Sequence, residues 1–123
     1  MYDKGLTLEV LMQIQAALRT IAERFKPVKT VLDFTGSPGG MEKLDSICML
    51  LIVVGETLKK LDKITDASLL AKYPQINWKQ VKGLRDVISH QYFDVNAEAI
   101  FDVCQTKIGP LGDAIAKIIE DLK

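Results

Sequence analysis

Apolar residues recur every three or four positions along most of this 123-residue chain. That spacing is typical of helices with one buried face. The first such stretch covers residues 3–25 and ends before Pro27, because the residue preceding a proline avoids helical backbone. Residues 91–95 alternate as an extended link would, but no stretch is a convincing strand, so the pattern predicts an all-α protein. The buried positions expected in this first helix are Leu8, Leu11, Ile14, Leu18, Ile21 and Phe25.

A second helix is predicted over residues 38–61, with Ser37 as its N-cap and a proline in its first turn. Its central block, residues 47–54, is apolar on every side. Such a helix lies deep in a bundle or in a subunit interface. Since a chain this short cannot easily surround one of its own helices, we expect burial against a second subunit. Gly55 costs about 1 kcal/mol relative to alanine in a helix interior and indicates a close approach of two backbones.

The remaining pattern predicts three further helical segments. A short helix is expected over residues 65–73, capped by Thr65. Asn77 and Asn96 are expected to cap the two segments that follow, and Pro110 is expected to kink the last one. Phe34 is expected to plug one end of the core. The inner face of the helix that starts at Trp78 is predicted to hold Trp78, Val81, Leu84, Val87 and Ile88, and that of the last segment Cys104, Ile108, Leu111, Ile115, Ile118 and Leu122.

Short links between long amphipathic helices favour an up-and-down four-helix bundle with a short extra helix, formed as one domain over residues 1–123. The composition, 48% hydrophobic and 26% charged, fits one globular domain. Sixteen basic residues balance sixteen acidic ones. This balance argues against a general nucleic-acid coat, because non-specific affinity depends on neutralising phosphates, but it leaves room for a local basic site.

Cysteine and histidine content narrows the chemistry. Cys48 and Cys104 fall within apolar helical patterns and are expected to be reduced and buried. A single histidine excludes a histidine-rich metal site. The chain shows neither a secretory signal nor an apolar run long enough to span a membrane, so we expect a soluble cytoplasmic protein.

The candidate chemistry lies between Arg85 and Tyr92, a segment that contains the only histidine, His90. On an ideal helix Arg85 and His90 are about 140° apart, since five residues turn through roughly 500°. Convergence therefore requires the helix to end near residues 89–90, or a second copy of the motif from another chain. By spacing alone, a lone histidine is more often structural than catalytic.

Arg85-x4-His90-x-Tyr92, placed behind a tryptophan-bearing helix, resembles the RxxxxHxY signature of HepT-like proteins, which belong to the HEPN superfamily. The resemblance covers nearly the whole chain. Glu56, with the two residues before it, is similar to the family's IGE segment. Further similar features are Phe34, Tyr73-Pro74 and the Pro110 kink.

The resemblance implies a fold, an activity and a set of partners. HEPN proteins are four-helix bundles that usually form homodimers, with two RxxxxH motifs facing each other. Many are metal-independent endoribonucleases that need no cofactor. HepT-like members are typically toxins paired with a small nucleotidyltransferase antitoxin. That partner can transfer AMP to the motif tyrosine, Tyr92 here.

Each residue type suits RNA cleavage by 2′-OH attack on the adjacent phosphate. His90 can transfer protons near neutral pH, and Arg85 presents a charged fork to phosphate oxygens. A dimer would supply two histidines, one as proton acceptor and one as donor. Supporting candidates are Tyr92, Asp86 and Glu56, with Lys79 and Lys82 for RNA contact. For each of them the non-functional alternative is a solvated or half-buried side chain.

A second function of a different class stays open on the sequence. The groove could hold a nucleotide or another substrate for a partner enzyme, making the chain a non-catalytic binding subunit of a two-component nucleotidyltransferase. The two hypotheses differ in whether the isolated dimer cleaves RNA.

Overall fold

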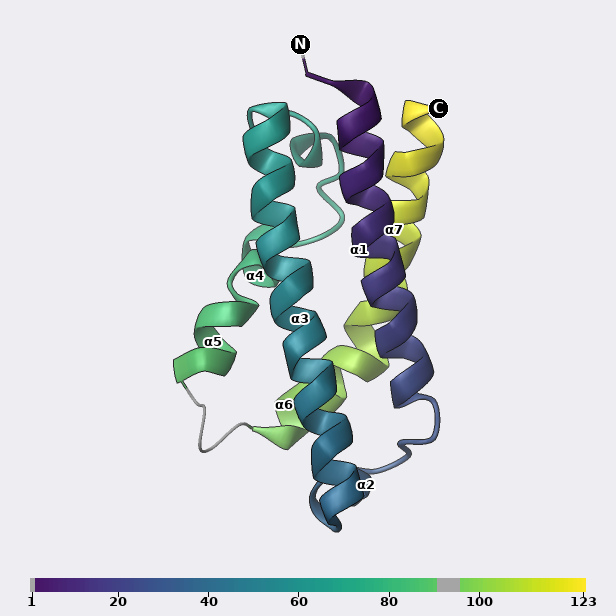
Figure 1. The fold of residues 1–123 in the computed structure, drawn as a ribbon, viewed down its shortest axis with the longest axis vertical. Coiled ribbons are helices and arrows are strands. Elements are labelled where there is room, and N and C mark those ends of the chain that lie inside the picture. Colours follow the sequence, from purple (N-terminus) through teal and green to yellow (C-terminus); the bar gives the residue numbers. More distant parts are fainter. Residues whose placement is uncertain (1, 91–95) are drawn as a thin grey trace.

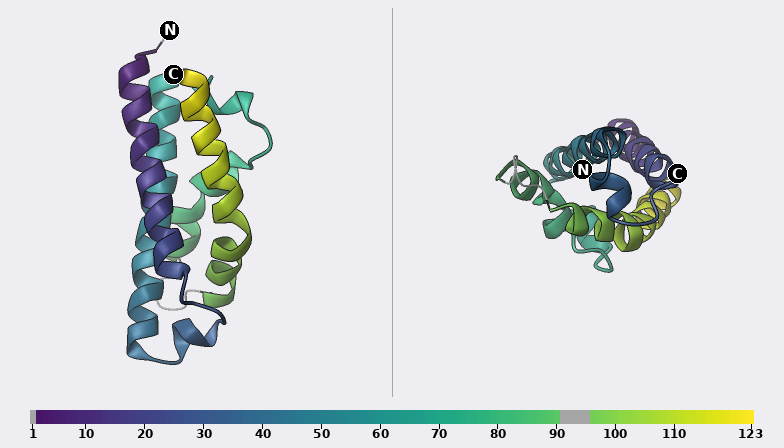
Figure 2. Two further views of the ribbon diagram at one scale, coloured as in Figure 1. Left: turned by 90° about the vertical axis from the view of Figure 1, so that its right-hand side faces the viewer. Right: turned by 90° about the horizontal axis from the view of Figure 1, so that it is seen from below.

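The computed structural model describes residues 2–90 and 96–123, without the side chains of residues 89 and 90, and those ranges are all-helical. Three long helices lie along one another, with α1 running opposite to α3 and α7 (Figure 1). Short elements fill the fourth side and the ends (Figure 2). The elements are α1 Lys4–Phe25, α2 Leu32–Thr35, α3 Pro38–Thr65, η1 Leu70–Lys72, α4 Trp78–Lys82, α5 Leu84–His90, α6 Ala97–Asp102, the π-helical turn η2 Val103–Lys107, and α7 Ile108–Leu122.

Side chains cap the helix starts as the sequence predicts. A cap oxygen accepts a hydrogen bond from a first-turn N–H that has no partner inside the helix. Ser37, Asn77 and Asn96 are confirmed as caps of α3, α4 and α6, and Asp3 caps α1. The bonds are Leu6 N–H to Asp3 Oδ1 (3.0 Å), Gly40 N–H to Ser37 Oγ (3.0 Å), Gln80 N–H to Asn77 Oδ1 (3.1 Å) and Ala99 N–H to Asn96 Oδ1 (3.0 Å).

The end of α3 differs from the prediction. The helix continues to Thr65, whose hydroxyl donates to the Leu61 carbonyl at 2.9 Å instead of capping a new helix. Asp66 then takes a left-handed conformation, with φ 54°, and closes α3. The expected helix over residues 65–73 is therefore wrong, and only the short 3₁₀ turn η1 forms there. A threonine can bond back to the carbonyl four residues earlier or cap the next turn, and periodicity does not distinguish these outcomes.

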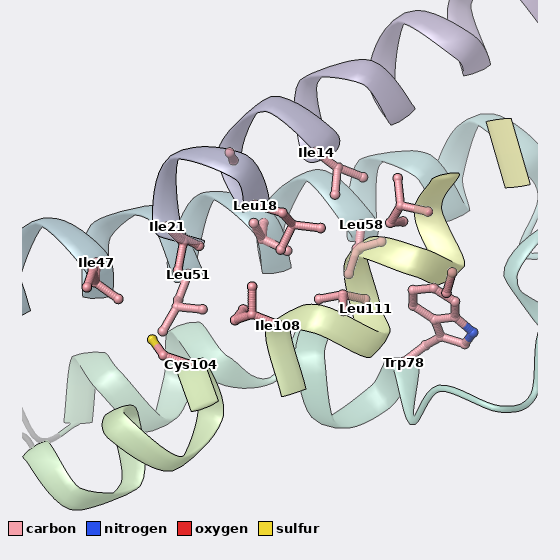
Figure 3. Packing of buried hydrophobic residues seen from close by; sticks show 14 of the residues in the cluster. Ile14, Leu18, Ile21, Ile47, Leu51, Leu58, Trp78, Cys104, Ile108 and Leu111 are labelled. Carbon is pink, nitrogen blue, oxygen red and sulfur yellow. The ribbon is translucent and has the colours of Figure 1, made fainter. Parts of the chain in front are cut away.

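One hydrophobic core joins α1, α3, η2 and α7. Figure 3 shows Ile14 and Leu18 of α1 facing Leu51 and Leu58 of α3. Phe34 is fully buried at one end, as expected. Its ring centroid lies 6.2 Å from that of Phe25, in a tilted arrangement, and 6.4 Å from that of Phe101, in the edge-on arrangement that aromatic rings favour.

The chain itself buries the inner half of the apolar block in α3. Ile47, Leu51 and Val54 have almost no exposed surface within the single chain. Our expectation that a second subunit covers this block is therefore wrong for these residues, because α1, α2 and α4 pack along α3. Met49 and Val53, on the outer side, are 61% and 42% exposed.

The chain changes direction between α6 and α7 (Figure 1). The π-helical turn Val103–Lys107 lies immediately before the proline-bearing first turn of α7. Pro110 has no N–H to donate to the Thr106 carbonyl, so the regular bond between these residues cannot form. The predicted kink thus takes the form of a π turn.

No helix in the described ranges is long and apolar enough to cross a lipid bilayer.

Candidate active site

The site begins with a close contact between α3 and α4. A Cβ atom added at Gly55 would lie 2.9 Å from the Val81 carbonyl oxygen, nearer than real Cβ atoms come. The sequence predicts this close approach of backbones, but its partner is α4 of the same chain. Glycine is therefore required here for α4 to reach α3.

Trp78 fixes α4 to the segment before it. The residue is 8% exposed, and its Nε1–H donates to the Tyr73 carbonyl at 2.8 Å. The Tyr73 hydroxyl donates to Asp121 Oδ2 at 2.6 Å and ties this segment to α7. Burial, followed by the bond to Asp121, raises the pKa of Tyr73 to about 12, so the phenol keeps its proton. Lys82, at the far end of α4, pairs with Asp62 of α3.

A break at Gly83 separates α4 from α5. The predicted single helix is therefore two short ones. Ile88 is buried as expected, but Val87 is 57% exposed, so its predicted place on the buried face is wrong. The physical reason is that the break changes the rotation of α5 relative to α4. Figures 1 and 2 show α5 at the outer edge of the molecule, against α3.

Arg85 lies on α5 with its side chain 53% exposed, and its Nη1 contacts Glu56 Oε1 at 3.3 Å. Glu56 Oε2 contacts Lys59 Nζ at 2.9 Å. The bond from Lys59, with the charge of Arg85, holds the pKa of Glu56 below its usual value, so this carboxylate is charged at neutral pH. An exposed pair contributes little to stability. Its effect is to orient the guanidinium, which has five N–H donors and keeps donors for a phosphate.

The path of α5 limits how Arg85 and His90 can meet. α5 runs from Leu84 to His90, its last helical residue, so the Cα atoms of Arg85 and His90 lie about 140° apart around the helix axis. The end of α5 at His90 agrees with the helix end expected near residues 89–90. The side chain of His90 and the whole of Tyr92, with the extended link expected over residues 91–95, lie outside the described residues.

The other candidate residues take separate places. Asp86 lies in the first turn of α5 and Lys79 on the exposed side of α4. Lys82 is 27% exposed and engaged with Asp62, which gives it a structural role beside the predicted RNA contact. The sequence reasoning missed Lys59 and Asp62 as partners. Lys59 could have been found from its place three residues after Glu56 on one helix. Asp62 left no such signal, because its partner Lys82 lies 20 residues away in the sequence.

The two cysteines are free and buried, as predicted. Burial raises the pKa of Cys48 to about 11 and that of Cys104 to about 12. Both thiols therefore stay protonated at neutral pH and are unsuited to nucleophilic attack.

A protein-family model described as Ribonuclease HepT-like matches residues 11–118. The chain belongs to this family. The HepT-like chain is 32% identical over 116 residues to a Methanocaldococcus jannaschii protein named "Putative RNase MJ0127", covering 89% of this chain and 90% of that one. A second protein of that organism, "Putative RNase MJ0125", is 33% identical over 63% of this chain and 64% of its own length.

A third relative comes from another organism. "Putative RNase TTE0752" of Caldanaerobacter subterraneus subsp. tengcongensis is 30% identical over 59% of this chain and 62% of its own length. No solved structure gives a significant match to the HepT-like chain. The family and these named relatives support a ribonuclease function.

The contact at Gly55 can be tested by adding one methyl group. Gly55→Ala forces the Val81 carbonyl away and is expected to lower the free energy of unfolding by about 1–3 kcal/mol, the usual cost of overpacking. Gly112→Ala in α7 is the matched control, because nothing lies within 4 Å of its added Cβ. The free energy of unfolding of this control should rise by about 0.5–1 kcal/mol, because alanine has a higher helix propensity than glycine. Urea unfolding measures both, and a Gly55→Ala variant as stable as the control would contradict the close approach.

Proposed function

We propose that this chain is a metal-independent endoribonuclease that acts as a homodimer, with Arg85 and His90 of both chains lining one shared cleft. The observation that carries the proposal is the exposed Arg85 guanidinium, which Glu56 contacts beside exposed apolar side chains of α3 and α5. Each chain carries one histidine, so a second chain supplies the second imidazole that a two-histidine mechanism needs. We interpret the three long helices and the α4–α5 side as an HEPN-like four-helix bundle with a broken helix.

An exposed apolar stripe beside Arg85 suits such a dimer. Met49 and Val53 are one helical turn apart on the outer face of α3, and Glu56 continues that face three residues later. Val87 adds a further exposed apolar side chain on the adjacent α5. Since Glu56 contacts Arg85, a second copy that covers this stripe brings both Arg85 guanidinium groups towards one cleft.

The cleavage step follows from these groups. One His90 imidazole takes the proton of a ribose 2′-OH, whose oxygen attacks the adjacent phosphorus. The bond to the 5′-oxygen breaks, and the second imidazole, as imidazolium, gives that oxygen a proton. The products are a 2′,3′-cyclic phosphate and a 5′-hydroxyl. Arg85 stabilises the extra negative charge on the phosphorane, and Glu56 orients Arg85.

The supporting residues act around this centre. Lys79 lies on the exposed side of α4 and can contact the RNA backbone, and Lys82 can do so if it leaves Asp62. Asp86 lies next to Arg85 in the first turn of α5 and is proposed to help position the motif.

We further propose that the chain is the toxin of a pair and that a nucleotidyltransferase silences it. The Tyr92 phenol oxygen attacks the α-phosphate of ATP, and pyrophosphate leaves. The added AMP places bulk and negative charge two residues from His90. This group would block the cleft and repel the RNA backbone.

Substitution of the motif tests catalysis. His90→Ala is expected to lower kcat for RNA cleavage by about 10²–10⁴-fold through loss of proton transfer. Arg85→Ala should lower kcat by about 10²–10³-fold through loss of charge stabilisation. Glu56→Gln should lower kcat by less than Arg85→Ala does, because the guanidinium stays in place. The assay is cleavage of a labelled RNA in EDTA, with circular dichroism as the folding control. A wild-type dimer that binds nucleotide but cleaves no RNA would contradict the endoribonuclease. It would support the non-catalytic substrate-binding subunit instead.

A charge placed in the apolar stripe tests the dimer. Met49→Glu is expected to convert the dimer to a folded monomer without cleavage activity, because a carboxylate is costly to bury in an apolar interface. Leu32→Glu is the matched control, since Leu32 is 72% exposed on α2, at the end of the molecule. Light scattering after size-exclusion chromatography gives the mass. A Met49→Glu variant that stays dimeric and active would refute this interface.

Silencing by AMP has its own measurement. Co-expression with a nucleotidyltransferase encoded next to this chain should restore growth and add one adenylate to the tryptic peptide that contains Tyr92, detected by mass spectrometry. Tyr92→Phe has no phenol to modify, so it should stay toxic under co-expression. An unmodified wild-type peptide in rescued cells would contradict the mechanism.

A further inference from the structure

A pocket of about 510 Å³ lies between α4 and the η2–α7 segment, apart from the Glu56–Arg85 pair. Its volume falls within the range of about 300–1,000 Å³ that is usual for small-ligand sites. The floor is apolar and comes from the core, with Leu51 and Val54 of α3 and Ile108 and Leu111 of α7. Figure 3 shows Leu51, Ile108 and Leu111 close together. A flat apolar group would find contacts on this floor.

The rim of the pocket is polar and carries no net charge. One bank has three amide side chains, Gln75, Asn77 and Gln80. The other bank has Asp102 and Lys107, whose charges cancel. Such a rim does not favour a phosphate, which needs an excess of positive charge or oriented N–H groups. It favours an uncharged group with hydrogen-bond donors and acceptors along its edge.

The π-helical turn brings a hydroxyl and an ammonium to the second bank. Thr106 Oγ1 donates to the Asp102 carbonyl at 2.8 Å, which leaves its oxygen available as an acceptor. Thr106 and Lys107 both belong to the π turn and both line the pocket. Single π turns within α-helices are frequent at functional sites.

The pocket and Arg85 share one segment of chain. Leu84 lines the pocket, and Arg85 follows it on α5. On α3, Val54 lines the pocket, and Glu56, two residues later, contacts Arg85. Residues that line the pocket and residues of the Arg85 site therefore neighbour one another along both helices.

We propose that this pocket takes one unpaired nucleobase, with adenine preferred. Where the base belongs to an RNA strand, this proposal rests on the proposed ribonuclease function. Proteins read single-stranded RNA by splaying out a base, packing its faces and bonding its edge. Glutamine and asparagine amides form paired bonds to adenine N6 and N7. The first bank supplies the Gln75 and Gln80 amides for this, whereas the Asn77 oxygen already accepts the Gln80 N–H.

Two substitutions separate the pocket from the rest of the surface. Ala99 is exposed, lines the pocket and contributes only its backbone to the Asn96 cap, so Ala99→Trp fills the mouth and keeps the helix. Ala116→Trp is the matched control, on the exposed face of α7 and outside the pocket lining. Gln80→Leu removes one amide while keeping the Asn77 bond, which uses the Gln80 backbone.

The first measurement needs no enzyme activity. Adenosine, guanosine, cytidine and uridine are each titrated into the full chain and followed by amide chemical shifts. Adenosine should bind most tightly and shift the signals of Gln80, Thr106 and Lys107. Ala99→Trp should weaken binding by about 10-fold or more, and Ala116→Trp should leave it unchanged. Absence of binding by all four nucleosides would overturn the free-nucleoside form of the proposal.

The second measurement uses short RNAs that differ in the base beside the cleaved bond. Wild type should prefer adenine at one position, and Gln80→Leu should reduce that preference by about 10-fold while cleavage continues. Unchanged preference in Gln80→Leu and Ala99→Trp would overturn the base pocket and leave the ribonuclease intact. Adenosine binding without any RNA cleavage would overturn the ribonuclease and support a nucleotide pocket. Loss of dimerisation in Ala99→Trp, with nucleoside affinity unchanged, would make this a protein interface and overturn the proposal.

Discussion

The contact of α4 with α3 across Gly55 determines where the functional segment lies. A side chain at that position would collide with the Val81 carbonyl, so the approach requires glycine. Trp78 and the Lys82–Asp62 pair hold the rotation of α4 on α3. Because α5 follows after a single residue, Gly83, this contact also sets the position of Arg85.

Stability and candidate chemistry are located in different parts of the molecule. The apolar core joins the three long helices, whereas α5 lies at the edge against α3 (Figure 1). Within α5, Ile88 is buried, while Arg85 and Val87 face outward. An exposed charged and apolar edge is suited to a second macromolecule, since its groups can be covered or bonded without disturbing the core. The proposed dimer and the proposed RNA site both use this arrangement.

Local signals in the sequence predicted the helix starts well. Asn77 and Asn96 cap their helices because a short polar side chain can reach the first-turn N–H groups whatever the rest of the fold does. Val87 was predicted wrongly because helical periodicity was carried across Gly83, where the rotation changes. Thr65 was assigned to a cap, although its hydroxyl had an equally good acceptor in the preceding turn.

The sequence by itself determined the all-helical fold, the caps, the buried faces of α1 and α7 and the motif from Arg85 to Tyr92. These features follow from hydrogen bonds, sterics and spacing within a few neighbouring residues. Only the tertiary structure decided that Glu56 contacts Arg85, that Gly55 meets α4 rather than a second chain, and that a pocket remains beside α4. The reason is physical: each of these features joins segments far apart in the sequence, and their distance and rotation are set by packing rather than by local preference.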